Sequence, residues 1–375
     1  MGMTGPSEDA VREALTGVID PEIRRSIVEL DMVESIVIEG GKVTVTVLLT
    51  IAGCPLKDTI TKDTKAAVAG VDGVAEVAVV LGTMTPEQRK EMKEKLQGSG
   101  TRDIPFNRPE SLTKVYAIAS GKGGVGKSSV TANLAVSLAD KGLRVGIVDA
   151  DIYGFSIPGM LGLSGKPTRV DEMILPQVAH DVKVMSIGMF VPPSQAVVWR
   201  GPMLHRALQQ FLTDVFWGDL DVLLLDLPPG TGDIAISVAQ LLPGSELLVV
   251  TTPQSAAAQV AERAGSIATQ TKQTLAGVIE NMSWMEMPDG TRMEVFGSGG
   301  GASVAENLAA ALDQEVPLLA QIPLDTRLRE GSDAGTPVVL GGPDSPAARA
   351  FDTLAESLRR RSRGLSGRSL GLSPV

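Results

Sequence analysis

The 375-residue sequence has one cysteine, Cys54, and two histidines, His180 and His205. One cysteine excludes an intrachain disulfide and any zinc or iron–sulfur site built from several cysteines of a single chain. The two histidines are far apart in the sequence and receive no metal role. No unbroken apolar run approaches the roughly 18 residues that a membrane span requires, so no span is expected.

Basic residues are too few for a broad nucleic-acid surface. The chain has 34 Lys and Arg against 44 Asp and Glu, a net charge of −10. Because nucleic-acid backbones bind to basic faces, no nucleic-acid partner is expected, and any bound phosphate must be held by local geometry. The N-terminus also lacks the pattern of a secretory leader, which favours a cytoplasmic protein.

The length favours one larger and one smaller domain. Residues 1–83 predict a small α+β domain: a helix starting at Ser7, a β-hairpin around Gly40-Gly41, a helix after Pro55 and a strand at "VAEVAVVL". Residues 84–113 are polar and rich in Gly and Pro, which predicts a partly helical linker. Residues 363–375 are expected to form a flexible tail.

Residues 114–362 alternate apolar strands with helical segments. The runs "KVYAIAS", "RVGIVDA", "VKVMSIG", "DVLLLDL", "ELLVVTT", "TLAGVIENM" and "PLLAQIP" lack strict alternation of polar and apolar residues, as expected for strands covered on both faces. This pattern predicts an α/β domain with a doubly wound, mostly parallel sheet.

A phosphate-binding loop follows the first of these strands. Residues 121–128 fit the pattern G-x-x-x-x-G-K-[ST], with an apolar strand before and a helical pattern after. Its backbone N–H groups can surround phosphate oxygens, Lys127 supplies a positive charge, and the Ser128 hydroxyl can bind Mg²⁺. The nucleotide-binding set is therefore Gly121, Lys122, Gly123, Gly124, Val125, Gly126, Lys127, Ser128 and Ser129. The pattern does not explain the second lysine, Lys122.

Two acidic segments support the loop. Asp226 ends the apolar strand "VLLLD", where a carboxylate can support magnesium as the Walker-B aspartate does. Asp149 and Asp151 lie two residues apart after another strand, so both side chains can leave an extended chain on the same side. One of them could orient an attacking water or meet the metal; otherwise they are an acidic strand end or a helix cap.

The segments "GKGGVGKSS", "DADIYG", "DLPPGTGD", "GVIENMS" and "FGSGGG" together resemble the Mrp/ApbC family of iron–sulfur cluster carrier ATPases. This family lies within the MinD/ParA/nitrogenase-iron-protein class of P-loop proteins. The N-terminal part, "DPEIRRSIVELDMVESI" through "TIAGCP", is similar to the SufT-like domain often fused to these carriers. The resemblance covers nearly the whole chain.

The resemblance implies roles for several residues. Lys122 would reach across a homodimer to the phosphates in the other subunit, Asp151 would position the attacking water, and Asp226 would support magnesium. The residues expected to contact adenine are Asn281, Pro323 and Asp325.

The chain departs from the family where the cluster is bound. The family has a C-x-x-C pair before the "FG-GGG" segment, whereas the corresponding stretch here, "WMEMPDGTRMEV", contains no cysteine. A [4Fe–4S] cluster generally needs four thiolates, and a homodimer of this chain has two, both Cys54. Cys54 precedes the helix expected after Pro55, where the helix dipole could favour its thiolate; the other reading is a small buried residue.

The resulting hypothesis is a homodimeric Mg-ATP-dependent ATPase, expected to turn over slowly, that binds iron–sulfur clusters and transfers them to apoproteins or works with assembly factors. The cluster rests on family resemblance, and its ligands are not identified. Two alternatives stay open. One is a positioning or scaffold switch like MinD or ParA, and the other is an adaptor in cluster assembly that binds no cluster itself.

Overall fold

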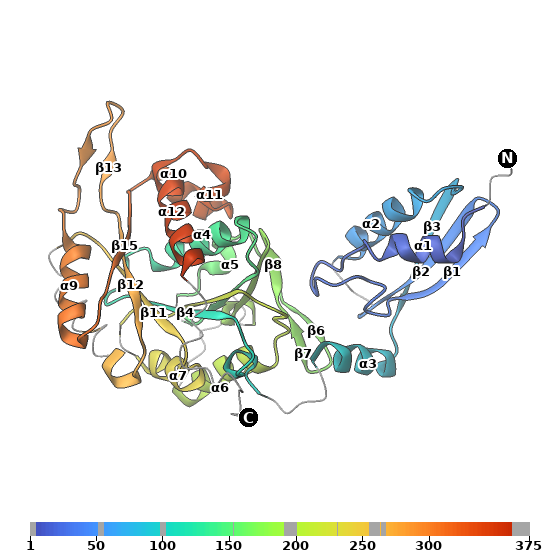
Figure 1. Cartoon of the computed structure of the whole chain (residues 1–375), viewed down its shortest axis with the longest axis horizontal. Coiled ribbons are helices and arrows are strands. Elements are labelled where there is room, and N and C mark those ends of the chain that lie inside the picture. Colours follow the sequence, from blue (N-terminus) through green and yellow to red (C-terminus); the bar gives the residue numbers. More distant parts are fainter. Residues whose placement is uncertain are drawn as a thin grey trace, which may run out of the picture. The chain divides into compact units, whose positions relative to one another are not determined.

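The computed structural model describes residues 5–51, 56–97, 103–152, 154–190, 201–230, 232–254, 263 and 268–361 (Figure 1). The chain divides into two compact units. Unit 1 contains Met1–Arg102, Pro167–Pro176 and Asp214–Gly218. Unit 2 contains Asp103–Lys166, Gln177–Thr213 and Asp219–Val375.

Unit 1 contains a three-stranded sheet in the order β1-β2-β3. Helix α1 (Glu8–Leu15) begins at Ser7, whose hydroxyl accepts a hydrogen bond from the Ala10 N–H at 3.2 Å. Strands β1 (Val33–Glu39) and β2 (Lys42–Leu49) are antiparallel, and Gly40 takes a φ of 63° at the turn, which glycine adopts without strain. Helix α2 (Lys57–Ala69) then connects β2 to β3 (Glu76–Thr83), which pairs parallel to β2.

Unit 1 extends past residue 83, where the sequence places a linker. Helix α3 (Pro86–Gln97) belongs to it, because Met92 is buried in the same apolar cluster as Leu15 and Val45. A hairpin of β6 (Thr168–Val170) and β7 (Met173–Leu175) also belongs to unit 1, although the sequence places it inside the larger domain. The hairpin is short and largely apolar, and its sequence gives no local sign of which core it joins.

Unit 2 is built on an eight-stranded sheet. Its order is β15-β12-β11-β4-β10-β5-β9-β8, and every neighbouring pair is parallel except β8 and β9. The expected doubly wound, mostly parallel sheet is thereby confirmed. The strands are β4 (Lys114–Ala119), β5 (Val145–Asp149), β8 (Gln177–Ala179), β9 (Val182–Ser186), β10 (Val222–Asp226), β11 (Glu246–Thr251), β12 (Leu275–Asn281) and β15 (Leu318–Ile322).

Helices cover both faces of this sheet, with α4 and α12 on one face and α6 and α7 on the other (Figure 1). In α12, Phe351, Leu354 and Leu358 are buried at helical spacing against the sheet and α4. The helices are α4 (Lys127–Asp140), α5 (Ile157–Met160), α6 (Gly201–Thr213), α7 (Asp233–Leu241), α9 (Gly300–Leu312), α10 (Thr326–Ala334), α11 (Val338–Gly341) and α12 (Pro346–Arg360), with 3₁₀ turns at Pro105–Asn107 and Ile187–Met189.

A short hairpin of β13 (Met285–Glu286) and β14 (Arg292–Met293) projects between β12 and α9 (Figure 1). The guanidinium of Arg292 lies 4.0 Å from the centre of the Trp284 ring, a cation–π contact at the base of the hairpin. Within the described part of the chain, no helix is both long and apolar enough to cross a membrane.

Candidate functional site

The candidate site lies at the carboxyl ends of three adjacent strands. Strand β10 sits between β4 and β5, and its last residue, Asp226, pairs in register with Ile118 of β4 and Asp149 of β5. The loop from Gly121 to Gly126 leaves β4 at this edge and enters α4 at Lys127. Open parallel sheets bind ligands at this edge, because loops and helix N-termini gather there.

The backbone of the loop depends on glycine. Gly124 and Gly126 both take a φ of 78°, in the left-handed region. At Gly126 there is also no space for a side chain, since an added Cβ would collide with the Asn281 amide. The loop surrounds an open pocket of about 210 Å³, lined by Ser120, residues 122–129, Asp151, Ser156, Met160 and Pro229. Of the expected loop residues, only Gly121 does not line it.

Beneath the loop, the buried carboxylate of Asp226 is paired with one ammonium and accepts hydrogen bonds from two hydroxyl groups. Lys127 Nζ lies 2.7 Å from Asp226 Oδ2, and the Ser128 hydroxyl donates to the same oxygen at 2.6 Å. Thr131 donates to Asp226 Oδ1 at 2.7 Å. Asp226 is fully buried and the Lys127 side chain is 6% exposed. An ammonium and two hydroxyls therefore hold the buried carboxylate in a fixed position, in a site that can bind charged groups.

Asp149 is a second buried carboxylate beside Asp226. Burial, together with the neighbouring charge of Asp226, raises the pKa of Asp149 to about 7, although hydrogen bonds from Ser186 and Asp151 and the charge of Lys127 act in the opposite direction. The Ser186 hydroxyl donates to Asp149 Oδ2 at 3.0 Å, and the Asp151 N–H donates to Oδ1 at 3.2 Å. When Asp149 is ionised, two carboxylates share one ammonium, so the site carries net negative charge.

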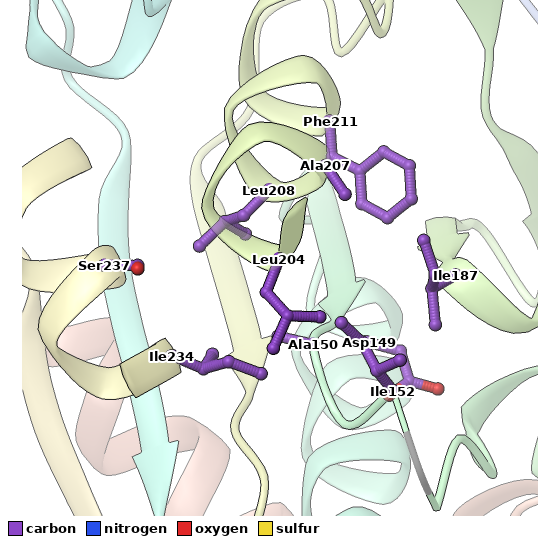
Figure 2. A pocket seen from close by; sticks show the side chains of 10 residues that line it. All are labelled: Asp149, Ala150, Ile152, Ile187, Leu204, Ala207, Leu208, Phe211, Ile234 and Ser237. Atoms are coloured by element: carbon purple, nitrogen blue, oxygen red, sulfur yellow. The ribbon is translucent and has the colours of Figure 1, made fainter. Parts of the chain in front are cut away.

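The burial of Asp149 has a visible cause. It lies at the edge of a small apolar pocket between β5, α6 and α7 (Figure 2). Side chains from α6, including Leu204, Leu208 and Phe211, and Ile234 from α7 surround this pocket. An apolar surrounding disfavours the charged carboxylate, which is why the pKa moves upward.

Asp151 lines the pocket beside the loop, and its carboxylate accepts a hydrogen bond from the Gly154 N–H at 3.0 Å. The Asp149–Asp151 spacing therefore gives the two carboxylates different environments. Asp149 is fully buried, whereas Asp151 lines the open pocket beside the loop.

Lys122 is bound within its own chain. Its ammonium donates to Gln254 Oε1 at 2.7 Å, and Arg263 donates to the Gly121 carbonyl at 2.6 Å. Sequence reasoning missed Gln254 and Arg263, which are more than 130 residues from the loop and belong to no recognisable motif. It also missed Thr131, although its spacing of four from Lys127 places both on one helix face.

Asn281 joins the loop to the far strands. Its Nδ2 donates to the Val125 carbonyl at 2.9 Å, and its Oδ1 is buried with no hydrogen-bond partner. Asn281 pairs in register with Ile322, so Pro323 follows directly beside it. Asp325 caps α10, and its carboxylate accepts from the Arg327 backbone N–H at 3.0 Å. The structure thus brings Asn281 and Pro323 together, while Asp325 is engaged in a local cap.

The described residues contain no group of three or more His, Cys, Asp or Glu side chains that could hold a metal ion. The β13–β14 hairpin occupies the region where the family's cysteine pair is expected, and it carries Met285, Glu286 and Met293 instead. Cys54 lies outside the described residues.

Comparisons with known proteins agree along the whole chain. The family described as NUBPL iron-transfer P-loop NTPase matches residues 111–359, and the family described as iron–sulfur cluster assembly protein matches residues 8–79. An iron–sulfur cluster carrier protein of Mycobacterium tuberculosis is 60% identical over 374 residues, covering 99% of this chain and 98% of the relative.

Similarity extends to more distant proteins. An iron–sulfur cluster carrier protein of Bacillus subtilis is 42% identical over 320 residues, covering 84% of this chain and 88% of the relative. Among solved structures, a nucleotide-binding protein from Archaeoglobus fulgidus in complex with ADP matches with a TM-score of 0.51 and 39% identity, covering 61% of this chain and 91% of that protein.

Proposed function

The chain belongs to the family of NUBPL-type iron-transfer P-loop NTPases, and on this premise we propose that it is an ATPase that carries iron–sulfur clusters and transfers them to apoproteins. The observation that carries the ATPase part is the buried arrangement of Lys127, Ser128 and Asp226 beneath a loop whose glycines leave an open pocket. The ADP complex of the Archaeoglobus relative supports a nucleotide in this pocket.

The residues of the loop bind the phosphates. Backbone N–H groups between Gly123 and Ser128 and the N-terminus of α4 attract the phosphate oxygens, and Lys127 is the nearest cation. Without nucleotide, Lys127 neutralises Asp226; with nucleotide, its charge is shared with the phosphates. Asp151, which lines the pocket, orients the attacking water and accepts its proton.

The donors at the base of the pocket suit magnesium. Ser128 and Asp226 supply a hydroxyl and a carboxylate oxygen, the hard ligands that Mg²⁺ prefers, and the ionised Asp149 adds negative charge nearby. When bound, Mg²⁺ would neutralise charge on the phosphates. The buried, unpaired Oδ1 of Asn281 is an acceptor that suits the amino group of adenine, with Pro323 beside it.

We place Lys122 in a second role, in a homodimer. A lysine that reaches the neighbour's phosphates brings a cation to the developing charge only when the dimer closes. Lys122 is held by Gln254 in the single chain, so closing would have to exchange this partner for phosphate. Dependence on dimer closure would make turnover slow.

The shortage of cysteine ligands for an iron–sulfur cluster favours the alternative of an adaptor that binds no cluster itself. The chain has one cysteine, and the described residues provide no metal-ligand group. A cluster carried as cargo would therefore need ligands from Cys54 of two chains and from a client or another partner. The second candidate function is an adaptor that keeps the ATPase switch and the assembly domain but binds no cluster itself, a role for which residues 8–79 are suited.

Substitution of the two lysines tests the ATPase mechanism. Lys127→Ala should abolish tight ATP binding, whereas Lys122→Ala should keep ATP binding and lose turnover by about 10²-fold or more. Lys90→Ala, on the exposed surface of α3, is the matched control. Normal turnover in Lys122→Ala would refute the cross-dimer role and leave ATP binding intact.

Iron and sulfide quantitation after anaerobic reconstitution tests the cargo. A carrier that uses Cys54 should bind iron in the wild-type chain and lose it in Cys54→Ser. If the wild-type chain binds no iron while its ATPase activity is intact, the adaptor is the correct function.

A further inference from the structure

The backbone of the phosphate loop differs in how its donors and its acceptors are used. In the part of the chain that the structure describes, no backbone N–H group from Lys122 to Gly126 donates a hydrogen bond. Three carbonyl groups at the ends of the loop, by contrast, each accept a hydrogen bond from a distant segment of unit 2. The pairs are Ser120 with the Gly230 N–H at 2.8 Å, Gly121 with Arg263 Nη1 at 2.6 Å, and Val125 with Asn281 Nδ2 at 2.9 Å.

The pair between Arg263 and Gly121 lies outside the pocket. Neither of these two residues lines the pocket, whereas Lys122, the next residue along the chain, does. A trans peptide points its C=O and N–H groups in opposite directions. Because the Gly121 carbonyl is turned toward Arg263, the Lys122 N–H of the same peptide is turned away from Arg263.

Little else restrains this peptide. Gly121 has no side chain to limit its backbone, and it lies between the end of β4 and the start of α4, outside the hydrogen-bonded ladder of either element. Among the described residues, Arg263 is the one that donates to the Gly121 carbonyl. A rotated peptide would turn its carbonyl oxygen toward bound phosphate, and the two negative oxygens would repel each other.

The guanidinium suits this task because it is a charged donor with a fixed geometry. A hydrogen bond from an ionised donor is roughly twice as strong as one between neutral groups. No carboxylate of the described residues forms an ion pair with Arg263, so none competes with Gly121 for it.

We propose that Arg263 is a positioning residue of the nucleotide site, which holds the Gly121 carbonyl outside the loop and thereby presents the Lys122 N–H to the phosphates. Arg263 acts through the peptide that it orients and does not touch the nucleotide. Its loss frees the peptide to rotate and removes one hydrogen bond to a charged phosphate, which lowers nucleotide affinity by about tenfold or more. This inference rests on the ATP binding proposed above.

Calorimetric titration of the full-length protein with ADP and Mg²⁺ tests this role. Arg263→Met removes the donor and keeps an unbranched side chain, so it should bind ADP about tenfold more weakly than the wild type, with an unchanged Tm in the absence of nucleotide. Arg263→Lys keeps a charged donor and should restore most of the affinity. A lower Tm, together with weak binding that Arg263→Lys does not restore, would make the role of Arg263 a general structural one and overturn the proposal.

A matched control is Arg349→Met. The Arg349 guanidinium also donates to a backbone carbonyl, that of Asp344, at 2.6 Å, and Arg349 does not line the pocket. This variant should bind ADP like the wild type. Equal loss of affinity in Arg349→Met and Arg263→Met would overturn the proposal, because the effect would not depend on the Gly121 carbonyl.

High salt separates positioning from simple attraction between the guanidinium and the phosphates. At about 1 M salt the Debye length is about 3 Å, so attraction over longer distances is screened. The ratio of wild-type to Arg263→Met affinity should persist there, and its disappearance would overturn the positioning role. Equal ADP affinity of the two proteins at low salt would overturn the inference and leave the proposed ATPase standing. No ADP binding by the wild type would overturn both.

Discussion

In the wild-type protein, ionisation of Asp149 should lower the free energy of unfolding as the pH rises. Replacing Asp149 with asparagine should remove this decrease. Asparagine has the same shape, can accept from the Asp151 N–H at the Oδ1 position, and can donate to the Ser186 hydroxyl. The substitution therefore removes the ionisation while keeping the packing around the pocket between β5, α6 and α7 (Figure 2).

The size of the effect follows from the raised pKa. The pKa of Asp149 rises from 3.8 to about 7 on folding. Between these values the folded state holds a proton that the unfolded state has lost, so stability falls as pH rises from about 4 to 7. Three pKa units correspond to about 4 kcal/mol in total, and the part between pH 5 and pH 8 is about 2.5 kcal/mol.

Urea unfolding followed by circular dichroism at pH 5 and pH 8, without nucleotide or magnesium, measures this difference. Asp149→Asn should match the wild type at pH 5 and be about 2.5 kcal/mol more stable than it at pH 8. Asp72→Asn, at an exposed position, controls for the loss of one carboxylate and should follow the wild type at both pH values. Parallel curves for Asp149→Asn and the wild type would show that Asp149 is ionised across this range.

Two further predictions concern packing. Gly126→Ala should weaken ATP binding by more than tenfold in equilibrium titration, because its Cβ displaces the Asn281 amide from the Val125 carbonyl; Gly142→Ala, also at positive φ but with open space around it, should leave binding unchanged. Met173→Ala should destabilise unit 1 by about 2–5 kcal/mol in urea unfolding, since Met173 is fully buried there. A loss below about 1 kcal/mol would mean that the hairpin is not part of that core.

Much of the fold could be read from the sequence because its signals are local. The apolar runs from residue 114 onward predict parallel strands, and seven of the eight strands of the observed sheet run parallel to one another. The N-terminal helix start at Ser7 and the hairpin turn at Gly40 depend on side chains within a few residues. The inserted hairpin could not be assigned in this way, because its own pattern fits either core.

The candidate site shows the same division. The loop from Gly121 to Ser128 is one continuous segment, so its glycine and lysine spacing can be recognised directly in the sequence. Asp226 can be predicted as a site residue because it ends an apolar strand. Other pairs, such as Lys122 and Gln254, come together only because the fold brings distant strands and loops close to one another. Nothing in the residues around either one specifies that pairing.

The sequence by itself determined the family, the mostly parallel sheet and the phosphate loop, since each depends on short-range patterns of glycine, charge and apolar spacing. Only the tertiary structure decided that Asp149 is buried beside Asp226, that Thr168 meets Glu22, and that the hairpin joins unit 1. These features arise when segments that are far apart in the sequence pack together and exclude water from the groups between them. Burial and hydrogen bonding there depend on every segment that encloses it.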